Sequence, residues 1–157
     1  MATWAEIRAA APKLVAAAQK RFKAHKHLTM ATLRSDGSPR ISGTELVIKN
    51  GELWLGGMPG SLKCRDLQRD PRVAVHSGSD DPATWTADAK IAGRAIEVTD
   101  DATKNAIVPS KDRPPGEFHL FRLDVTELVV TGIGKPADHL VVESWHEGRG
   151  VERVERR

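Results

Sequence analysis

Residues 28–48, LTMATLRSDGSPRISGTELVI, contain two runs of alternating apolar and polar side chains with a turn between them. This alternation has the period of two that β-strands show, and Asp36-Gly37 is a frequent core of tight hairpin turns. We therefore expect a strand over Leu28–Leu33, a turn over Ser35–Pro39 and a second strand over Arg40–Ile48. This hairpin sets the fold class, because the following residues repeat the same rhythm.

Further short segments of this kind follow at close intervals. The expected strands are Glu52–Leu55, Arg72–His76, Lys90–Val98 with a bulge near Gly93, Phe118–Val125, Leu128–Ile133 and His139–Trp145, before a charged tail from His146. Short helices are expected from Ser61 to Asp70 and from Asp100 to Ile107, and an ordered surface loop or lid over Pro109–Gly116. About seven or eight strands, mostly joined by hairpins, predict a mainly β fold with flanking helices: an antiparallel sheet closed into a small barrel.

The amino-terminal segment has a helical period instead. Its apolar side chains recur at helical spacing, Thr3 and Glu6 form a capping-box pattern, and Pro12 predicts a break. We expect residues 1–26 to pack on the barrel as a helical segment and residues 27–157 to form the barrel domain.

Composition excludes several classes of function. A net charge of +3 and 4% aromatic residues in 157 argue against a nucleic-acid partner. No apolar run is long enough for a membrane helix, which predicts no membrane partner. The single cysteine, Cys64, cannot form an internal disulfide, and no metal-ligand spacing is present, so we expect a cytoplasmic protein without a metal site. Cys64 itself is expected to be a small buried side chain.

The stretch GGMPGSLK, residues 56–63, predicts an anion site. A glycine-rich connection leads into the amino terminus of a helix, where unpaired amides point outward. Ser61 adds a hydroxyl donor and Lys63 a positive charge, so a phosphate ester would be stabilised there. The alternative is a glycine-rich turn with a capping serine and a solvated lysine.

Two more stretches are candidates for ligand contacts. In the second strand, alternation places Arg40, Ser42 and Thr44 on one face, with Gly43 removing a side chain between them. Near the carboxyl end, Trp145 offers a flat aromatic face and Arg149 a forked cation. The alternatives are a simply exposed strand face and a disordered basic tail.

These stretches occur in an order that resembles the pyridoxamine 5′-phosphate oxidase-like family. The similar segments are Ala31–Arg34, Asp36–Pro39, Gly60–Lys63, Leu67–Val73 and the Glu-x-Trp that ends at Trp145. The resemblance extends from about His27 to Arg153, and it implies an antiparallel, Greek-key-like split β-barrel of the FMN-binding type.

The resemblance also implies a function. It implies a homodimer that holds FMN in a groove between subunits and transfers a hydride through flavin N5 to or from a small molecule. Arg40 and Lys63 match phosphate-binding positions, Leu55 and Gly56 match backbone beside the flavin, and Trp145 matches the terminal aromatic. No catalytic acid or base is implied.

Three departures from the family pattern argue against a vitamin B6 enzyme. Glu45 and Leu62 stand where the full oxidases carry basic residues, and Arg149 follows Trp145 at a spacing that matches only loosely. The alternatives are therefore a deazaflavin-dependent reductase, and a non-catalytic protein that binds flavin or haem.

Overall fold

A computed structural model of the chain describes residues 2–113 and 115–157. The helices are α1 (Trp4–Ala10), α2 (Pro12–Ala24), α3 (Leu62–Arg69), α4 (Asp101–Ile107) and the 3-10 turn η1 (Ser110–Asp112). The strands are β1 (Leu28–Leu33), β2 (Pro39–Thr44), β3 (Leu46–Lys49), β4 (Glu52–Gly57), β5 (Arg72–His76), β6 (Ala87–Val98), β7 (His119–Ile133), β8 (Leu140–His146) and β9 (Gly150–Arg156).

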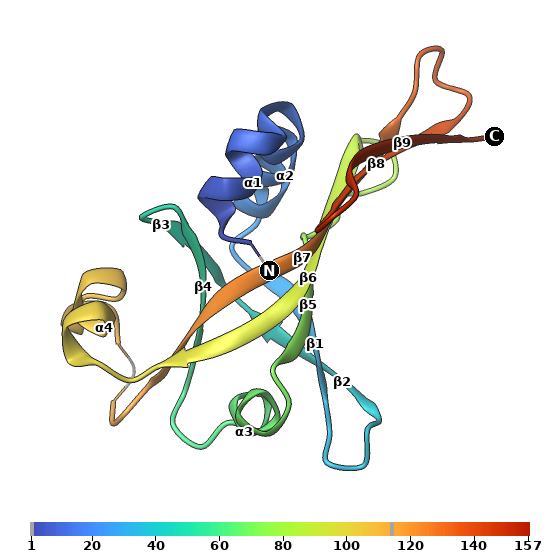
Figure 1. Cartoon of the computed structure of the whole chain (residues 1–157). Helices are drawn as coiled ribbons and strands as arrows, with labels where there is room; N and C mark the ends of the chain where they lie inside the picture. The colour runs from blue at the N-terminus through green and yellow to red at the C-terminus, as the bar shows by residue number, and fades with distance from the viewer. Residues whose placement is uncertain (1, 114) are drawn as a thin grey trace.

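The described strands pair antiparallel, as predicted; seven follow the order β2-β1-β5-β6-β7-β4-β3, and β8 and β9 branch from β7. The two ends of this order, β2 and β3, are consecutive in the chain, with Glu45 as the one residue between them. A sheet whose outer strands are joined so closely must curl back on itself, and it forms the barrel that Figure 1 shows.

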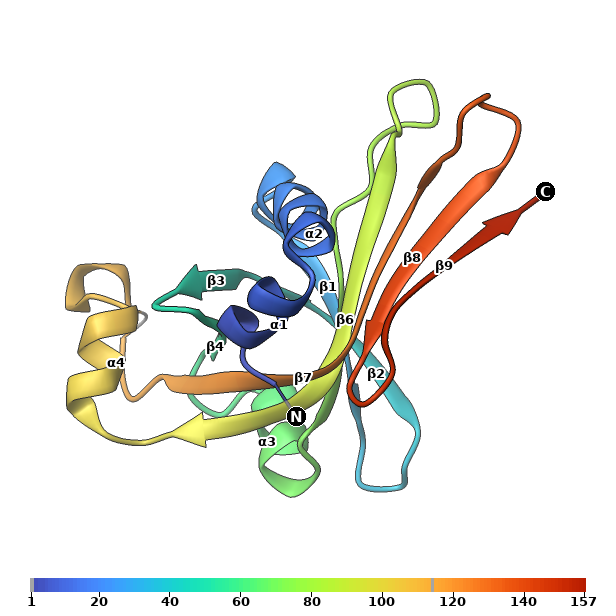
Figure 2. The same ribbon diagram turned by 45° about the horizontal axis from the view of Figure 1, so that its top comes forward.

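The longest strand, β7, links the barrel to an extension. Its first part pairs with β4 and its second part with β8, while β6 runs along the other side throughout. Between these two partners, Val125 pairs with Ala2: the Ala2 amide donates to the Val125 carbonyl at 3.0 Å, and the Val125 amide donates to the Ala2 carbonyl at 2.8 Å. The hairpin β8–β9 therefore projects from one end of β6–β7, whereas α4 lies at the other end (Figure 2).

The main core joins the barrel to the amino-terminal helices. Trp4, Ile7, Val15 and Phe22 are buried in one cluster with strand residues such as Leu123. The predicted capping box is confirmed, with Thr3 Oγ1 accepting from the Glu6 amide at 3.1 Å, and Pro12 begins α2 as expected. Helix α3 covers the opposite side of the barrel from α1 and α2 (Figure 1).

One predicted strand, Arg40–Ile48, is two strands in the structure. β2 pairs with β1 up to Thr44, and β3 pairs with β4 from Leu46 onward. The prediction was wrong because alternation continues through the exposed Glu45, while the pairing partner changes there.

Two predicted strands, Phe118–Val125 and Leu128–Ile133, are one strand. In β6, Gly93 pairs with Val125 and Ala92 with Glu127, so Thr126 is an extra residue in β7. This bulge confirms the irregularity predicted near Gly93 and lets β7 continue through it. A Cβ at position 93 would lie 2.0 Å from the carbonyl oxygen of Asp124, which explains the glycine.

The charged tail is also ordered. Gly150–Arg156 forms β9 and pairs with β8 along its whole length. Most of its side chains are exposed, so the strand lacks the apolar alternation by which the others are identified.

Candidate functional site

A groove of about 740 Å³ lies where β2, β4 and α3 meet, and the segment that follows α4 forms its far wall. Its lining includes four of the predicted site residues, Gly43, Thr44, Gly56 and Lys63. The other lining residues are His27, Glu45, Val47, Gly57, Met58, Ile107, Val108, Pro109, Lys111, Asp112, Arg113, Phe118 and Leu120. Apolar walls with a few charged side chains are typical of small-molecule sites.

Strand β2 presents two different faces, as the alternation predicts. Arg40, Ser42 and Thr44 are turned inward and at least partly buried, whereas Ile41 and Gly43 are exposed. A Cβ at Gly43 would meet no atom within 4 Å, so the exposed side of the backbone is accessible here. Arg40 donates from Nε to the Asp66 carboxylate on α3 at 2.7 Å.

The start of α3 carries the predicted anion contacts. Gly60 turns the chain with a φ of +73°, and Ser61 is the N-cap residue. The Ser61 hydroxyl makes no capping bond; its Oγ is buried beside the Cys64 thiol, and its hydrogen bond with that thiol acts to lower the pKa of Cys64 against the effect of burial. Lys63 reaches across from α3 and donates from Nζ to the Gly43 carbonyl at 2.9 Å. Unpaired first-turn amides and a nearby ammonium fit a phosphate group.

The end of β4 brings backbone into the groove. Leu55 pairs with Leu46 on one side and Phe121 on the other, and its side chain is buried in the core. Gly56 and Gly57 continue past the end of β3, so their backbone is paired with β7 alone. Leu55 thus contributes no side chain to the groove, while Gly56 lines it.

Cys64 packs behind Gly57, where a Cβ would lie 2.0 Å from its Sγ. The thiol is buried, as predicted, and burial raises its pKa. A protonated thiol enclosed by protein does not act as a nucleophile at neutral pH.

The far wall is built around Phe118. This ring packs with Trp54, Ile107 and Leu120 in a second apolar cluster. Two cations lie over the ring, with Lys104 Nζ at 5.1 Å and Arg113 Cζ at 4.7 Å from its centre.

Hydrogen bonds from Lys104 and Arg113 join the segments that form this wall. Lys104, which is buried, donates to the Phe118 carbonyl at 3.0 Å, and Arg113 donates to the Val108 carbonyl at 2.9 Å and to Asn105. These contacts hold the predicted loop Pro109–Gly116 at Arg113, and Pro114 lies outside the described residues.

Several residues that line the groove were not predicted from the sequence. Val47, Met58, Ile107 and Leu120 line the groove, and each looks like an ordinary apolar position in the sequence. Only the dense prolines after Ile107 pointed to a loop near the site.

The predicted residues at the carboxyl end lie apart from the groove. Trp145 is buried in the main core and pairs with Leu128 and Val151. Arg149 is exposed in the turn between β8 and β9, where its amide donates to the His146 carbonyl at 3.1 Å. The structure does not bring either residue to the groove of the same chain.

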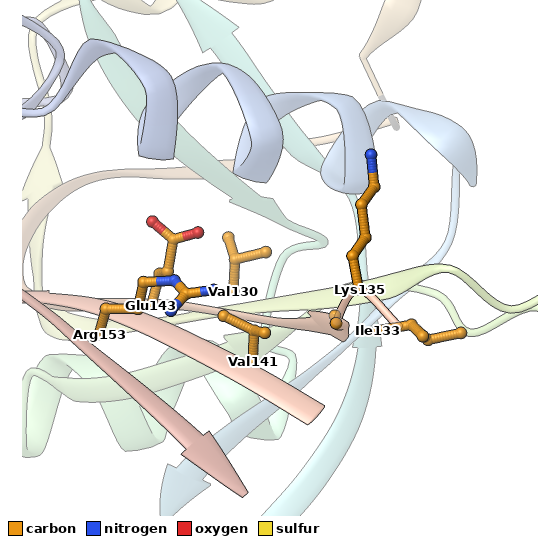
Figure 3. A pocket seen from close by; sticks show the side chains of 8 residues that line it. Val130, Ile133, Lys135, Val141, Glu143 and Arg153 are labelled. Atoms are coloured by element: carbon orange, nitrogen blue, oxygen red, sulfur yellow. The ribbon is translucent and has the colours of Figure 1, made fainter. Parts of the chain in front are cut away.

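A second, smaller hollow of about 290 Å³ lies on the β7–β8–β9 extension. Figure 3 shows Glu143 and Arg153 beside Val130 and Val141 at this hollow. None of the predicted site residues lines it.

Histidines of the described chain make structural hydrogen bonds. Within residues 2–113 and 115–157, no group of three or more His, Cys, Asp or Glu side chains could hold a metal ion. His76 and His119 make the structural hydrogen bonds expected of strand histidines, to the Ser77 carbonyl and to Glu97. None of the described helices has the length and apolar character needed to cross a bilayer.

Comparison with known proteins agrees with this geometry. The family profile described as "Pyridoxamine 5′-phosphate oxidase" matches residues 14–131. No curated protein sequence matches the chain.

Solved structures share the fold. A pyridoxamine 5′-phosphate oxidase-related, FMN-binding protein from Nostoc punctiforme PCC 73102 is 16% identical with a TM-score of 0.62, over 91% of this chain and 94% of that one. A putative pyridoxamine 5′-phosphate oxidase from Listeria innocua is 21% identical with a TM-score of 0.57, over 76% and 95%. PhzG from Burkholderia lata 383, solved with tetrahydrophenazine-1-carboxylic acid, is 16% identical with a TM-score of 0.59, over 96% and 89%.

The profile match covers most of the chain, and the fold is the antiparallel split β-barrel of these structures. The chain belongs to the pyridoxamine 5′-phosphate oxidase family.

Proposed function

We propose that this protein binds FMN in the β2–β4–α3 groove and acts as an oxidoreductase on a small molecule. The observation that carries the proposal is the position of Lys63, which lines the groove from the first turn of α3 and contacts the backbone of Gly43 across it. An ammonium beside the unpaired amides of a helix start stabilises a bound anion. The names of the Nostoc protein and of the family support a flavin phosphate as that anion.

Groups that line the groove, and three that lie beside it without lining it, Arg40, Ser42 and Ser61, then have definite tasks. Ser61, Lys63 and the first amides of α3 hold the phosphate, and Arg40 adds a forked cation from β2. Ser42 and Thr44 offer hydroxyls on the same inward face of β2 as Arg40. The backbone of Gly43 and Gly56 gives close approach to the ring, because neither residue carries a side chain there.

The groove walls orient the ring and exclude water. Phe118, Leu120 and Val108 supply apolar surface, and Lys104 with Arg113 holds the Phe118 segment in place. When bound, FMN supplies a ring that accepts and returns a hydride at N5. The protein's share of the chemistry is orientation and a dry, polarised environment.

We further propose a homodimer with the cofactor between subunits. Leu140, Val151 and Val154 are exposed apolar side chains on β8 and β9, the projecting hairpin that also carries Arg149. In a homodimer the turn of this hairpin would bring Arg149 to the groove of a second copy, and Trp145, which lies beside that turn, would hold it against the core. This arrangement accounts for ligand residues that the single chain keeps apart.

A deazaflavin coenzyme is the second candidate. Lys111 and Arg113 extend the positive charge of the groove beyond Lys63, and a longer anionic coenzyme would follow them. Haem is a third candidate: among the described residues that line the groove, His27 is the histidine that could ligate its iron.

Absorption spectroscopy separates these candidates. The purified protein is titrated with FMN, riboflavin, the deazaflavin coenzyme and haem, with tryptophan quenching as a second readout. We expect stoichiometric FMN binding and much weaker riboflavin binding, since only FMN carries a phosphate. Preferential binding of the deazaflavin would establish the second candidate, and a folded protein that binds none of the four would contradict all three.

A further inference from the structure

Asp66 is a buried carboxylate between α3 and the β1–β2 hairpin. Its residue is 2% exposed, and it accepts three hydrogen bonds. Thr32 and Arg40 donate to Oδ2, each at 2.7 Å, and Arg69 donates to Oδ1 at 3.0 Å. Burial alone raises the pKa of Asp66, but the three donors outweigh it and hold the pKa below the ordinary value. The carboxylate is therefore charged at neutral pH.

The Arg40 guanidinium contacts Asp66 through one of its edges. Only its Nε donates to Asp66; the two terminal nitrogens, Nη1 and Nη2, have no hydrogen-bond partner in the described part of the chain. The side chain is 21% exposed, so these terminal donors are not sealed in the core. Asp66 thus fixes one edge of the guanidinium and leaves the opposite edge available to a ligand. An available edge with two terminal nitrogens suits bidentate recognition of phosphate oxygens.

Two bridges between β2 and α3 reinforce this geometry. Arg40 on β2 meets Asp66 on α3, and three residues along each element Gly43 meets Lys63. Arg40 is also opposite Thr32 in the β1–β2 pairing, and both donate to the same carboxylate oxygen. The Arg40 side chain is therefore located by its strand and by its ion partner together.

We propose that Asp66 is a positioning residue for anion binding, which holds Arg40 by Nε so that its terminal nitrogens receive the cofactor phosphate. The inference rests on the proposed function, and it deepens it by naming what gives the site its preference for a phosphorylated flavin. A residue with a merely structural role would affect phosphorylated and unphosphorylated flavins alike.

The test compares FMN with riboflavin in Asp66→Asn. We expect FMN affinity to fall about tenfold or more, the scale of a lost charge-assisted contact, and riboflavin affinity to change less than about twofold. In an Arg40→Gln background, Asp66→Asn should cause no further loss of FMN affinity, because its effect passes through Arg40. An equal loss for both flavins, or additive effects of the two substitutions, would overturn the proposal.

A second variant covers the case in which Asp66→Asn does not fold. Thr32→Val removes one donor to the same carboxylate oxygen and leaves both charges in place. We expect a smaller loss, about threefold for FMN and none for riboflavin. Equal losses for the two flavins, or no loss of FMN affinity, would again contradict the positioning role.

Failure of the proposed function can be told apart from failure of this inference. If the wild-type protein binds no flavin, inorganic phosphate is titrated while the ¹⁵N resonance of Arg40 Nε is followed. A phosphate-dependent shift that Asp66→Asn abolishes supports the positioning role without any flavin. The absence of a shift in the wild-type protein, or its persistence in the variant, overturns it.

Discussion

The Lys63 ammonium lies 2.9 Å from the carbonyl oxygen of Gly43, and this contact joins the helix and the strand that carry the proposed phosphate contacts. The partner is an uncharged carbonyl, so this contact does not pair the lysine with an anion. It also keeps two further N–H donors for an anion. The contact therefore holds the groove together and places a positive charge in it.

Lys63→Ala tests this contact. We expect FMN affinity to fall about tenfold or more and riboflavin affinity to stay within about twofold, since a charge-assisted bond to phosphate is lost. Lys13, exposed on α2, gives a matched control, and Lys13→Ala should leave both affinities unchanged. A parallel loss for FMN and riboflavin would place the phosphate elsewhere.

Gly43→Leu separates binding from folding. A Cβ at this position meets no protein atom within 4 Å, so we expect circular dichroism and the thermal midpoint to remain close to wild type. The leucine side chain would occupy the space in which the flavin ring approaches β2, and flavin binding should be lost. Unchanged flavin affinity in a folded variant would exclude this part of β2 from the site.

Mixing two variants tests the shared site. If Arg149 serves the groove of a second copy, Lys63→Ala and Arg149→Ala homodimers each lack a complete site. After subunit exchange, a mixed dimer would combine both lesions in one groove and leave the other intact. We then expect about a quarter of all grooves to regain wild-type FMN affinity, as random pairing of two symmetric partners gives. No recovery after confirmed exchange would contradict a shared site.

The buried thiol of Cys64 predicts a loss of stability in alkali. Burial raises its pKa in the folded protein, so its contribution is complete below the ordinary thiol pKa and is lost as pH rises toward the folded value. Between about pH 8 and pH 10, the free energy of unfolding should fall more steeply for the wild-type protein than for Cys64→Ala. Urea titrations at several pH values measure this difference, and equal slopes would show that the thiol does not titrate differently on folding.

Elements whose boundaries depend on residues adjacent in the sequence were predicted correctly from local patterns. β1 and β5 have the expected bounds, and α4 begins after its capping Asp100. Alternation and capping could be predicted because both depend on residues close together in the sequence. The break at Glu45 and the bulge at Thr126 depend on which strand lies alongside, and no local pattern carries that information.

The candidate site divides in the same way. Ser61 and Lys63 follow from a glycine-rich loop that leads into a helix, which the sequence displays directly. The wall around Phe118 is assembled from α4 and the start of β7, and Asp66 acquires its role only when Thr32 and Arg40 come to it from the hairpin. Periodicity and motif spacing do not predict which distant residues the fold brings together.

The pairing of Ala2 with Val125 bears on the order in which the chain becomes native. Its partner lies on the order of 120 residues away, so closing this contact requires a large loss of chain entropy. During synthesis, α1 and α2 emerge first but have no β7 to pack against until most of the protein has been made. The amino-terminal helices are therefore the first segment to leave the ribosome, but they cannot pack in their native place until β7 has been made.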